Sequence, residues 1–356
     1  MNMTMAVVLL LSVFVVCLVI GLEIPLSVLA ASVAALMYMD MPVTMAIARA
    51  GATLQTYNLL AIPLFIVAGE ILSDGSLSER IIEFVDALVG WMRGGMAMVN
   101  ILASTFFGGI SGSPLADISS LGTVLIPMMK KQGYDADFAT DVTVTSAQQG
   151  LLIPPSHNMI IYAMAAGGAA SIAKLFMAGI VPGLLLALVL MVYSYYLSIK
   201  RHYPKGDAFQ LKKVVKTFFT SFWGLMTLAI IIIGCTTGIC TATEAAAISI
   251  LWALLVTKFI YKDMTWKRFW ALLGRAVKTV AVVMLAMGFS AIFGWMLAFL
   301  KVPNMLTSLV TGFTTNRYMI LFLINIILIF LGMIMDMGSL LVIVTPIFLP
   351  LVQSVG

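Results

Sequence analysis

Asp117 is the residue of this sequence whose type and position most clearly indicate chemistry. It closely follows a stretch rich in Gly and Ser at residues 108–114, and apolar runs flank both. A carboxylate in such surroundings is costly unless it is paired, so a binding role is the first interpretation. Capping of a helix N-terminus is the alternative, and one residue can do both. Helix ends here would offer N–H groups to carboxylates and carbonyl groups to cations. The candidate cation- or substrate-binding residues are Ser111, Gly112, Ser113, Pro114, Asp117 and Ser120.

A second polar stretch, at residues 146–158, interrupts the next apolar segment. Two adjacent prolines, Pro154 and Pro155, cannot continue a helix without losing hydrogen bonds. A break with this many polar groups inside a membrane span belongs where it lines a cavity, and a simple kink is the alternative. A single His without clustered ligands does not indicate a metal site, so we expect His157 to act as a hydrogen-bond donor. The candidate binding residues are Gln148, Gln149, Gly150, Pro154, Pro155, Ser156, His157 and Asn158.

The elements that position these residues are predicted from the apolar runs. Hydrophobic residues make up 62% of the 356 residues and charged residues only 10%, which is too little charge for the surface of a soluble domain. Runs near the length needed to cross a bilayer recur along the chain, and the absence of period-2 alternation excludes a barrel. We therefore predict an all-α polytopic membrane protein. The first run lacks a basic region before it, so it is interpreted as a span rather than a signal peptide.

Basic residues cluster in two stretches that predict cytoplasmic loops. One holds Lys200, Arg201, Lys205, Lys212, Lys213 and Lys216, and the other holds Lys258, Lys262, Lys267, Arg268, Arg275 and Lys278. The apolar runs 218–235 and 242–256 lie between them, which corresponds to one excursion out of the cytoplasm and back. The net charge of +5 is explained by these loops, so no nucleic-acid partner is expected. Residues 73–94 have charges on one helical face only, which predicts a helix lying at the membrane interface.

An internal repeat relates the two halves of the chain. Residues 117–127 resemble residues 336–346, because both begin with Asp, end with Pro and place a Ser at the fourth position. Two further matches occur in the same order, residues 65–72 with 289–297 and residues 39–41 with 262–264. We interpret them as a duplication, and chance similarity in a biased composition is the alternative. The candidate residues of the second copy are Gly332, Asp336, Gly338 and Ser339.

Two segments, residues 95–131 and 317–356, have polar centres and apolar flanks of about 15 residues, which is marginal for a full span. We predict re-entrant helical hairpins, and pairs of full spans are the alternative. As hairpins they leave five crossings between them and open to opposite sides, the inverted arrangement of two-repeat secondary transporters. The predicted layout is scaffold helices at 1–72, an interfacial arm at 73–94, the first hairpin at 95–131, transport-domain helices at 138–199 with a break near 150–158, a basic loop at 200–217, scaffold helices at 218–300, a second arm at 301–316 and the second hairpin at 317–356.

The chain resembles the large membrane subunit (M subunit, DctM-like) of tripartite ATP-independent periplasmic (TRAP) transporters over nearly its whole length. The resemblance is carried by PLFIVAGE at 63–70, GISGSPLAD at 109–117, LIPPS at 152–156, KLFMAGIVPG at 174–183, TEA at 243–245 and GMIMD at 332–336. It implies a permease of the bacterial inner membrane that imports an organic acid by a sodium-coupled elevator mechanism. It also implies two partners, a periplasmic substrate-binding protein (P-type) and a small four-helix membrane subunit (Q-type) expected as a separate chain. Family sodium sites would correspond to residues 111–117 with 150–156 and to residues 332–339, and no cofactor beyond Na⁺ is expected.

The second repeat departs from the first, because it stops just after its hairpin. The first repeat continues for about 80 residues after Asp117. A second repeat of the same length would end near position 420. We therefore expect that the 356-residue chain does not transport alone, and sodium-driven uptake in proteoliposomes would contradict this.

Other functions and substrates stay open. An elevator-type anion or ion carrier that needs no binding protein is the alternative. The sequence has no HExxH motif, Walker motif or nucleophile–base pair, so a membrane enzyme or a pump driven directly by ATP is not favoured. The sequence does not identify the substrate: C4-dicarboxylates, sialic acid and other sugar acids stay open, and the polar residues around the Pro-Pro break slightly favour a hydroxylated sugar acid.

Overall fold

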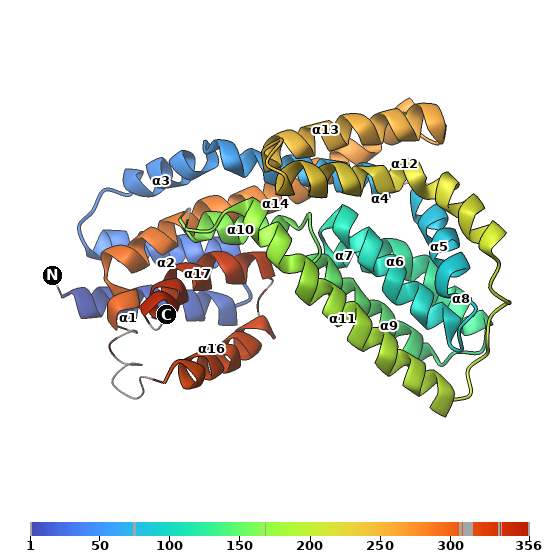
Figure 1. The fold of residues 1–356 in the computed structure, drawn as a ribbon. Coiled ribbons are helices and arrows are strands. Elements are labelled where there is room, and N and C mark those ends of the chain that lie inside the picture. The colour runs from blue at the N-terminus through green and yellow to red at the C-terminus, as the bar shows by residue number, and fades with distance from the viewer. Residues whose placement is uncertain are drawn as a thin grey trace. The chain divides into compact units, whose positions relative to one another are not determined.

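A computed structural model of the chain describes residues 2–73, 76–167, 169–305, 308, 316–333, 335 and 337–354. The described residues form helices and connecting turns (Figure 1), with a single isolated β-bridge between Arg93 and Lys205. This confirms the all-α prediction. The chain divides into two compact units, unit 1 with Met1–Leu59, Ile161–Ala170 and Val280–Gly356, and unit 2 with Leu60–Ile160 and Ser171–Thr279.

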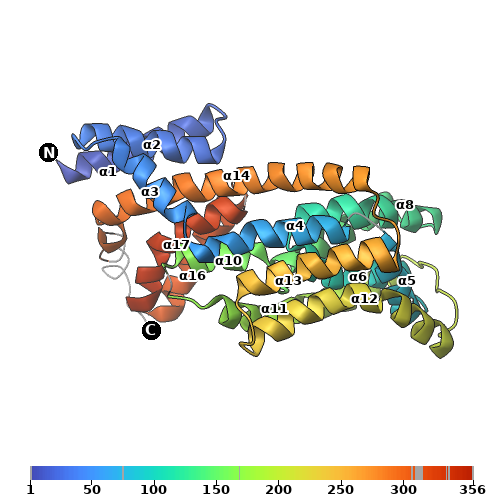
Figure 2. The same ribbon diagram turned by 90° about the horizontal axis from the view of Figure 1, so that it is seen from above.

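Unit 1 contains both ends of the chain. Its described helices are α1 (Met3–Val19), α2 (Ile24–Tyr38), α3 (Thr44–Leu54), the end of α10 (His157–Ala165), the second half of α14 (Trp266–Phe299), α16 (Arg317–Gly332) and α17 (Met337–Ser354). Helices α1 and α2 lie side by side (Figure 2). The core includes Leu36, Phe293 and Met296, all fully or almost fully buried, and the Phe14 ring packs at 5.5 Å from that of Phe293.

Unit 2 carries the first predicted hairpin and the predicted break. Its elements are α4 (Ala61–Ser73), α5 (Ser76–Val89), α6 (Gly95–Ser111), α7 (Pro114–Asp117), the π-helical turn η2 (Ile118–Gly122), α8 (Thr123–Lys131), α9 (Ala136–Ala147), the 3-10 turn η3 (Gln148–Leu151), the start of α10 (His157–Ala165), α11 (Ile172–Lys200), α12 (Leu211–Thr236), α13 (Ala242–Leu255) with the π-helical η4 (Val256–Ile260), and the first half of α14. Its core lies among α5, α6, α8 and α9, around Ile81, Met98, Phe107 and Leu125. This apolar core holds together the helices that carry the first predicted hairpin.

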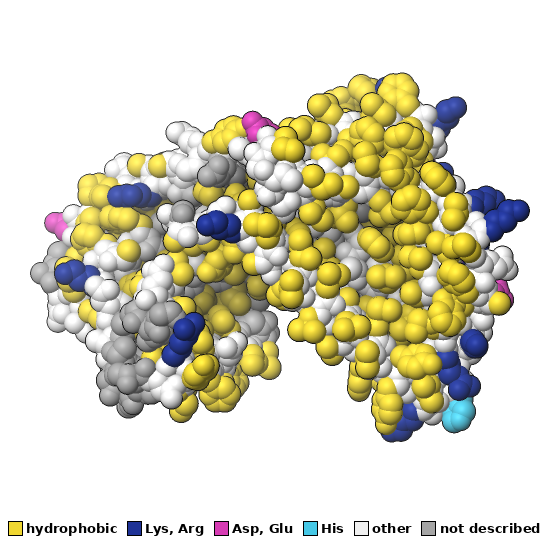
Figure 3. Space-filling view, viewed as in Figure 1, with side chains coloured by type: hydrophobic (Ala, Val, Ile, Leu, Met, Phe, Trp, Pro, Cys, Tyr) yellow, Lys and Arg dark blue, Asp and Glu magenta, His cyan; other side chains and the backbone are white. Residues whose placement is uncertain are grey.

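Four helices among the described residues are long and apolar enough to cross a membrane. They are α11, α12, α13 with η4, and α14, which have 29, 26, 19 and 34 residues. Figure 3 shows hydrophobic side chains covering the face that α11 presents, and Val181, Leu188 and Val192 there are 72, 58 and 63% exposed. Exposed apolar side chains along a helix of this length are explained by contact with lipid, which confirms a multi-pass membrane protein.

Two helices begin earlier than the apolar runs that predict them. Helix α12 begins at Leu211, so Lys212, Lys213 and Lys216 lie on its first turns rather than in the predicted loop at 200–217. Helix α14 likewise begins at Trp266, so Lys267, Arg268, Arg275 and Lys278 of the second basic stretch lie within this helix. Lysine is a good helix former with a long aliphatic stem, so a helix can continue through such residues where the hydrocarbon ends.

Helix α5 is amphipathic, as predicted for the arm. Leu77, Ile81 and Val85 are buried, whereas Glu79 and Glu83 point outward. The helix packs against α6 and α12, and the Ser221 hydroxyl of α12 donates a hydrogen bond to the Arg80 carbonyl at 2.7 Å. Its location at the membrane surface stays a prediction.

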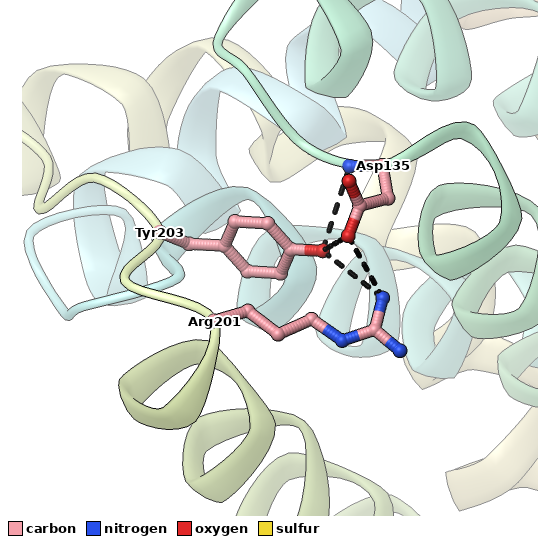
Figure 4. Close-up of polar contacts among 3 residues, drawn as sticks. All are labelled: Asp135, Arg201 and Tyr203. Carbon is pink, nitrogen blue, oxygen red and sulfur yellow. Dashed lines mark hydrogen bonds and ion pairs between the residues drawn. The ribbon is translucent and has the colours of Figure 1, made fainter.

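The loop between α11 and α12 is fastened to the loop between α8 and α9 (Figure 4). The Tyr203 hydroxyl and Arg201 Nη1 donate to the same oxygen of Asp135, at 2.7 and 2.9 Å. These hydrogen bonds, first that from Tyr203 and then that from Arg201, hold the pKa of the Asp135 carboxyl below its ordinary value. Burial, followed by the bond to Asp135, raises the pKa of Tyr203. The loop therefore has a defined path over the base of the predicted hairpin.

The two turns matched in the internal repeat have similar local structure. Each follows a helix, and each contains a non-glycine residue in the left-handed region, Asp40 and Lys262, both with φ of 57°. The matched helical segments lie in α4 and α14. One difference is that residues 44–73 are divided into α3, the short turn Tyr57–Leu60 and α4, whereas α14 is continuous.

Candidate cation and substrate site at the first hairpin

The tip of the first hairpin is formed by residues that stop one helix and start the next. Gly112 ends α6 with φ of 61°, a left-handed conformation that glycine adopts without strain, and its N–H donates to the Gly108 carbonyl at 2.7 Å. Ser113 then has extended backbone and its hydroxyl accepts from the N–H of Ala116, while Pro114 takes the first helical position. Residues 95–131 thus form a helix, a turn and a second helical segment, and their assignment as a re-entrant hairpin rather than two full spans stays a prediction.

Asp117 does not cap this helix. Ser113 occupies the cap, and the Asp117 carboxyl makes no capping hydrogen bond. Its side chain is 1% exposed. The Ser104 hydroxyl of α6 lies close to the carboxyl, but neither carboxylate oxygen has a hydrogen-bond partner among the described residues. A buried carboxyl without a partner is costly, so this arrangement suits a bound cation or a proton.

The predicted break in the following span is an irregular segment rather than a kink. Helix α9 ends at Ala147, the 3-10 turn η3 follows, and regular helix resumes at His157. The Pro154–Pro155 peptide bond between them is cis. This segment faces the hairpin tip, because a Cβ added to Gly112 would lie 3.0 Å from the Pro155 carbonyl oxygen and 3.2 Å from His157 Nδ1. Helix α7 also contacts both η3 and α9.

Two glycines allow the hairpin and the break to approach closely. A Cβ added to Gly108 would lie 2.6 Å from the Cα of Gly150, and one added to Gly150 would lie 3.1 Å from the Cα of Gly108. A side chain at position 108 would require the backbone of Gly150 to move, and one at position 150 would make an unusually tight contact. The site is therefore assembled by direct backbone contact between α6 and η3.

A row of polar side chains joins α6 to α9 and leads to this glycine contact. Asn100 Nδ2 donates to Thr143 Oγ1 at 2.7 Å, the Ser104 and Ser146 hydroxyls are 3.1 Å apart, and Thr105 Oγ1 donates to Gln149 Oε1 at 2.5 Å. All six residues are buried. Apart from Gln149 they are absent from the predicted candidate residues, although polar residues that recur within apolar helices were a usable signal.

The structure brings together only part of the predicted set. Gly112, Ser113, Asp117, Gly150, Pro155 and His157 lie on elements that meet at the tip. Pro154 and Asn158 are buried beside them, and the buried Ser156 hydroxyl has no described hydrogen-bond partner. Gln149 is engaged by Thr105.

Two predicted residues use their side chains for local hydrogen bonds. Gln148 is exposed and its amide donates to the Val144 carbonyl, and the Ser120 hydroxyl donates to the Ala116 carbonyl of its own helix at 2.8 Å. Gln148 is turned to the exposed surface, whereas Ser120 is half-buried in η2, which packs against α9. The side chain of Ser111 lies outside the described residues.

The second predicted site lies in unit 1 and is described only in part. Helices α16 and α17 pack against each other, and the Asn316 side chain caps the first by accepting from the N–H of Tyr318 at 2.9 Å. Gly332 is exposed at the end of α16, and Ser339 is 7% exposed near the start of α17 beside Gly338. Asp336 lies outside the described residues, so its predicted role stays a prediction.

The described residues contain no group of three or more His, Cys, Asp or Glu side chains gathered as for a transition metal. The first hairpin carries oxygen donors instead. A buried carboxylate, hydroxyls and the free carbonyl groups of an interrupted helix are the donors that coupling ions use in secondary transporters. Asp117 and the non-helical carbonyls near Pro155 are such donors.

Spanning helices, a helical hairpin and an interrupted helix facing it define a multi-pass membrane transport protein. The family model of the tripartite ATP-independent periplasmic transporter, DctM component, matches residues 11–356, and the chain belongs to this family of bacterial inner-membrane permeases. It is 37% identical over 303 residues to the sialic acid TRAP transporter large permease protein SiaM of Vibrio cholerae, covering 85% of this chain and 70% of the relative. It is 34% identical over 304 residues to the C4-dicarboxylate TRAP transporter large permease protein DctM of Pseudomonas aeruginosa, covering 85 and 71%.

A solved structure supports the fold independently of sequence. The YdaH transporter of Alcanivorax borkumensis superposes with a TM-score of 0.54 at 14% identity, covering 90% of this chain and 73% of that one. Similarity at this identity concerns the fold alone. The comparisons confirm the family resemblance and the membrane location.

Proposed function

We propose that this protein is the permease subunit of a sodium-coupled TRAP transporter that imports an organic acid. The observation that carries the proposal is the buried Asp117 carboxyl, which has no described hydrogen-bond partner and lies at a hairpin tip facing an interrupted helix. Sodium would bind to this carboxylate together with carbonyl groups of the irregular segment. Binding of the ion would neutralise the carboxylate and so permit a substrate anion to approach the same tip.

The substrate class follows from charge and from the relatives. SiaM and DctM are named for sialic acid and C4-dicarboxylates, which are both organic acids. A candidate donor for a carboxylate is the imidazole of His157, which lies beside Gly112. A periplasmic binding protein would deliver the acid, and a small membrane subunit would complete the scaffold against which the hairpin and broken helix move as an elevator.

The sodium site is tested by uptake into proteoliposomes. The permease is reconstituted with its small subunit and its loaded binding protein, and the initial rate is measured against external Na⁺. We expect Asp117→Asn, which keeps the shape but removes the charge, to raise the Na⁺ concentration for half-maximal uptake about tenfold. Asp141→Asn, at an exposed position on α9, is the matched control and should leave the curve unchanged. An unchanged curve for the Asp117 variant, or uptake without Na⁺, would contradict the proposal.

The substrate and the need for a binding protein require separate measurements. A thermal-shift screen of the binding protein against C4-dicarboxylates, sialic acid and other sugar acids identifies the acid. Uptake that persists after removal of the binding protein would favour the alternative, an elevator-type carrier that works alone.

A further inference from the structure

A pocket of about 340 Å³ lies at the base of the first hairpin, remote in sequence from its tip. It is lined by Trp91, Met92, Arg93, Tyr195 and Lys205. The first three residues precede α6, Tyr195 belongs to the last turns of α11, and Lys205 belongs to the loop between α11 and α12. We call it the Arg93–Lys205 pocket. All of its residues belong to unit 2.

The backbone holds the two cations of this pocket side by side. Arg93 and Lys205 form the isolated antiparallel bridge, and the N–H of Gly94 donates to the Pro204 carbonyl at 3.0 Å. Gly94 packs so tightly against α11 that an added Cβ would lie 2.0 Å from the Ser198 hydroxyl oxygen. These backbone contacts therefore place the two residues next to each other without an acidic partner.

The charges around the pocket leave a net positive site. Both cationic side chains are exposed, and neither forms an ion pair with a described acid. Neighbouring basic residues differ, because Arg201 is paired with Asp135 and Lys213 with Asp86. Lys205 also borders an adjacent pocket that contains Asp86 and Asp207, but Arg93 does not. The pocket thus offers two cationic side chains to an anion.

The pocket continues into an apolar surface of α11. Val192 and Leu188 lie three and seven residues before Tyr195, which places them on the same helical face, and they are 63 and 58% exposed. Trp91 and Tyr195 are 40 and 39% exposed beside the cations. Tyr and Trp are enriched where hydrocarbon meets the headgroups, so this end of α11 has the features of a membrane boundary. Figure 3 shows the same change from hydrophobic to basic side chains toward the end of α11.

We propose that the Arg93–Lys205 pocket binds the phosphate of an anionic phospholipid in the leaflet that the basic loops predict to be cytoplasmic. The two cations hold the phosphate, Trp91 and Tyr195 flank the glycerol region, and an acyl chain follows Val192 and Leu188 along α11. Basic pockets between spanning helices on the cytoplasmic side bind anionic headgroups by this chemistry. Free phosphate would use the cations but would leave the apolar row without a role. The bound lipid would fasten the base of the hairpin to α11, whatever the transported substrate is.

The test uses the delipidated permease with its small subunit and vesicles of defined composition. Dioleoylphosphatidylglycerol is titrated in, bound lipid is counted by native mass spectrometry, and brominated phosphatidylglycerol reports on Trp91 by fluorescence quenching, measured as the difference from Trp91→Phe. We expect Arg93→Gln with Lys205→Gln to weaken phosphatidylglycerol binding about tenfold or more. The matched control, Lys130→Gln with Lys131→Gln, removes the same charge from exposed residues outside the pocket and should leave affinity unchanged.

Arg93→Lys keeps the charge and is expected to retain binding, which separates loss of charge from damage to the fold. If both double variants lose affinity equally, the lipid is attracted by the overall positive charge of the surface and not by this pocket, and the proposal is overturned. Equal quenching of wild-type Trp91 by brominated phosphatidylcholine would also overturn it. Displacement of the lipid by millimolar inorganic phosphate would overturn it as well. Another contradicting result would be Trp91 quenching that occurs in the permease alone but disappears when the small subunit is added, because the pocket would then be covered by protein and not by lipid.

Discussion

Ser113 caps the helix after the hairpin tip and Asp117 does not, although the sequence allowed Asp117 both roles, capping and binding. An N-cap residue needs extended backbone, which Ser113 has, whereas Asp117 has helical φ and ψ four residues later. The hydroxyl therefore satisfies the helix end, and the carboxylate is left without a capping role. This is why the choice between capping and binding could not be made from residue types alone, since both residues are good caps and only the backbone selects one.

Asp135 gives a pH-dependent prediction at the residue scale. Its carboxyl has a lowered pKa because Tyr203 and Arg201 donate to it. A carboxyl with a lowered pKa adds stability above its ordinary value near 3.8 and loses that contribution as the pH falls below this value. We expect Tyr203→Phe to lower the unfolding midpoint at pH 7, and the difference from wild type to shrink as the pH is lowered toward 3.

Thermal unfolding in detergent, followed across this pH range, measures the effect. Asp137→Asn, at an exposed position two residues further on, should show no such pH-dependent difference. A Tyr203→Phe deficit that stays constant down to pH 3 would mean that packing of the ring, and not its bond to the carboxylate, accounts for the loss.

The contact between α6 and η3 gives a prediction at the element scale. An Ala at position 108 would place Cβ 2.6 Å from the Cα of Gly150, which is backbone and has no rotamer to change. The two elements must then separate, and the polar row between α6 and α9 separates with them. We expect Gly108→Ala to lower the unfolding midpoint and to reduce uptake about tenfold or more.

Gly274→Ala is the matched control for that variant. It makes the same substitution within α14, where an added Cβ meets nothing within 4 Å. The change there should be neutral or stabilising by about 0.5–1 kcal/mol, since alanine favours helix over glycine. If the two variants behave alike in unfolding and in uptake, close approach at Gly108 is not what the hairpin needs.

The sequence predicts where helices are interrupted better than it predicts which residues of two helices contact each other. Gly112, Pro114 and the Pro154–Pro155 pair act locally, so the hairpin and the break could be placed within a few residues. The bonds Asn100–Thr143 and Ser104–Ser146 join residues 43 and 42 positions apart, and which faces of α6 and α9 meet depends on how both helices rotate. The start of α12 at Leu211 was missed for a different reason, because lysines mark a membrane boundary without ending a helix.

At the scale of the whole molecule, charge predicts an orientation that labelling can test. The loop at residues 201–210 should be cytoplasmic, and the turn at 237–241, between α12 and α13, should be periplasmic. With Cys17, Cys235 and Cys240 replaced, we expect Asp207→Cys to react with a membrane-impermeant maleimide only in inverted vesicles. Thr237→Cys, also exposed, should react in intact spheroplasts. Labelling of both positions from the same side would contradict the predicted orientation.

Two of the short motifs that carry the family resemblance coincide with elements that break regular helix, whereas PLFIVAGE and KLFMAGIVPG lie within the regular helices α4 and α11. The GISGSPLAD stretch forms the hairpin tip, and LIPPS forms the irregular segment facing it. The inverted-repeat arrangement is a property of the whole molecule, and it stays a prediction because no local pattern fixes how one half lies against the other.

Helix α14 has 34 residues and is therefore about 51 Å long, against a hydrocarbon layer of about 30 Å. The helix must therefore tilt in the bilayer or extend beyond the hydrocarbon layer. Its first turns carry the exposed Trp266 and Trp270 next to Lys267 and Arg268. Such a segment fixes the depth of the helix at one surface and leaves the remaining mismatch to its inclination. Bilayer thickness would therefore affect this protein through α14. Lipids with longer or shorter chains would change the tilt of this helix before they change any binding residue.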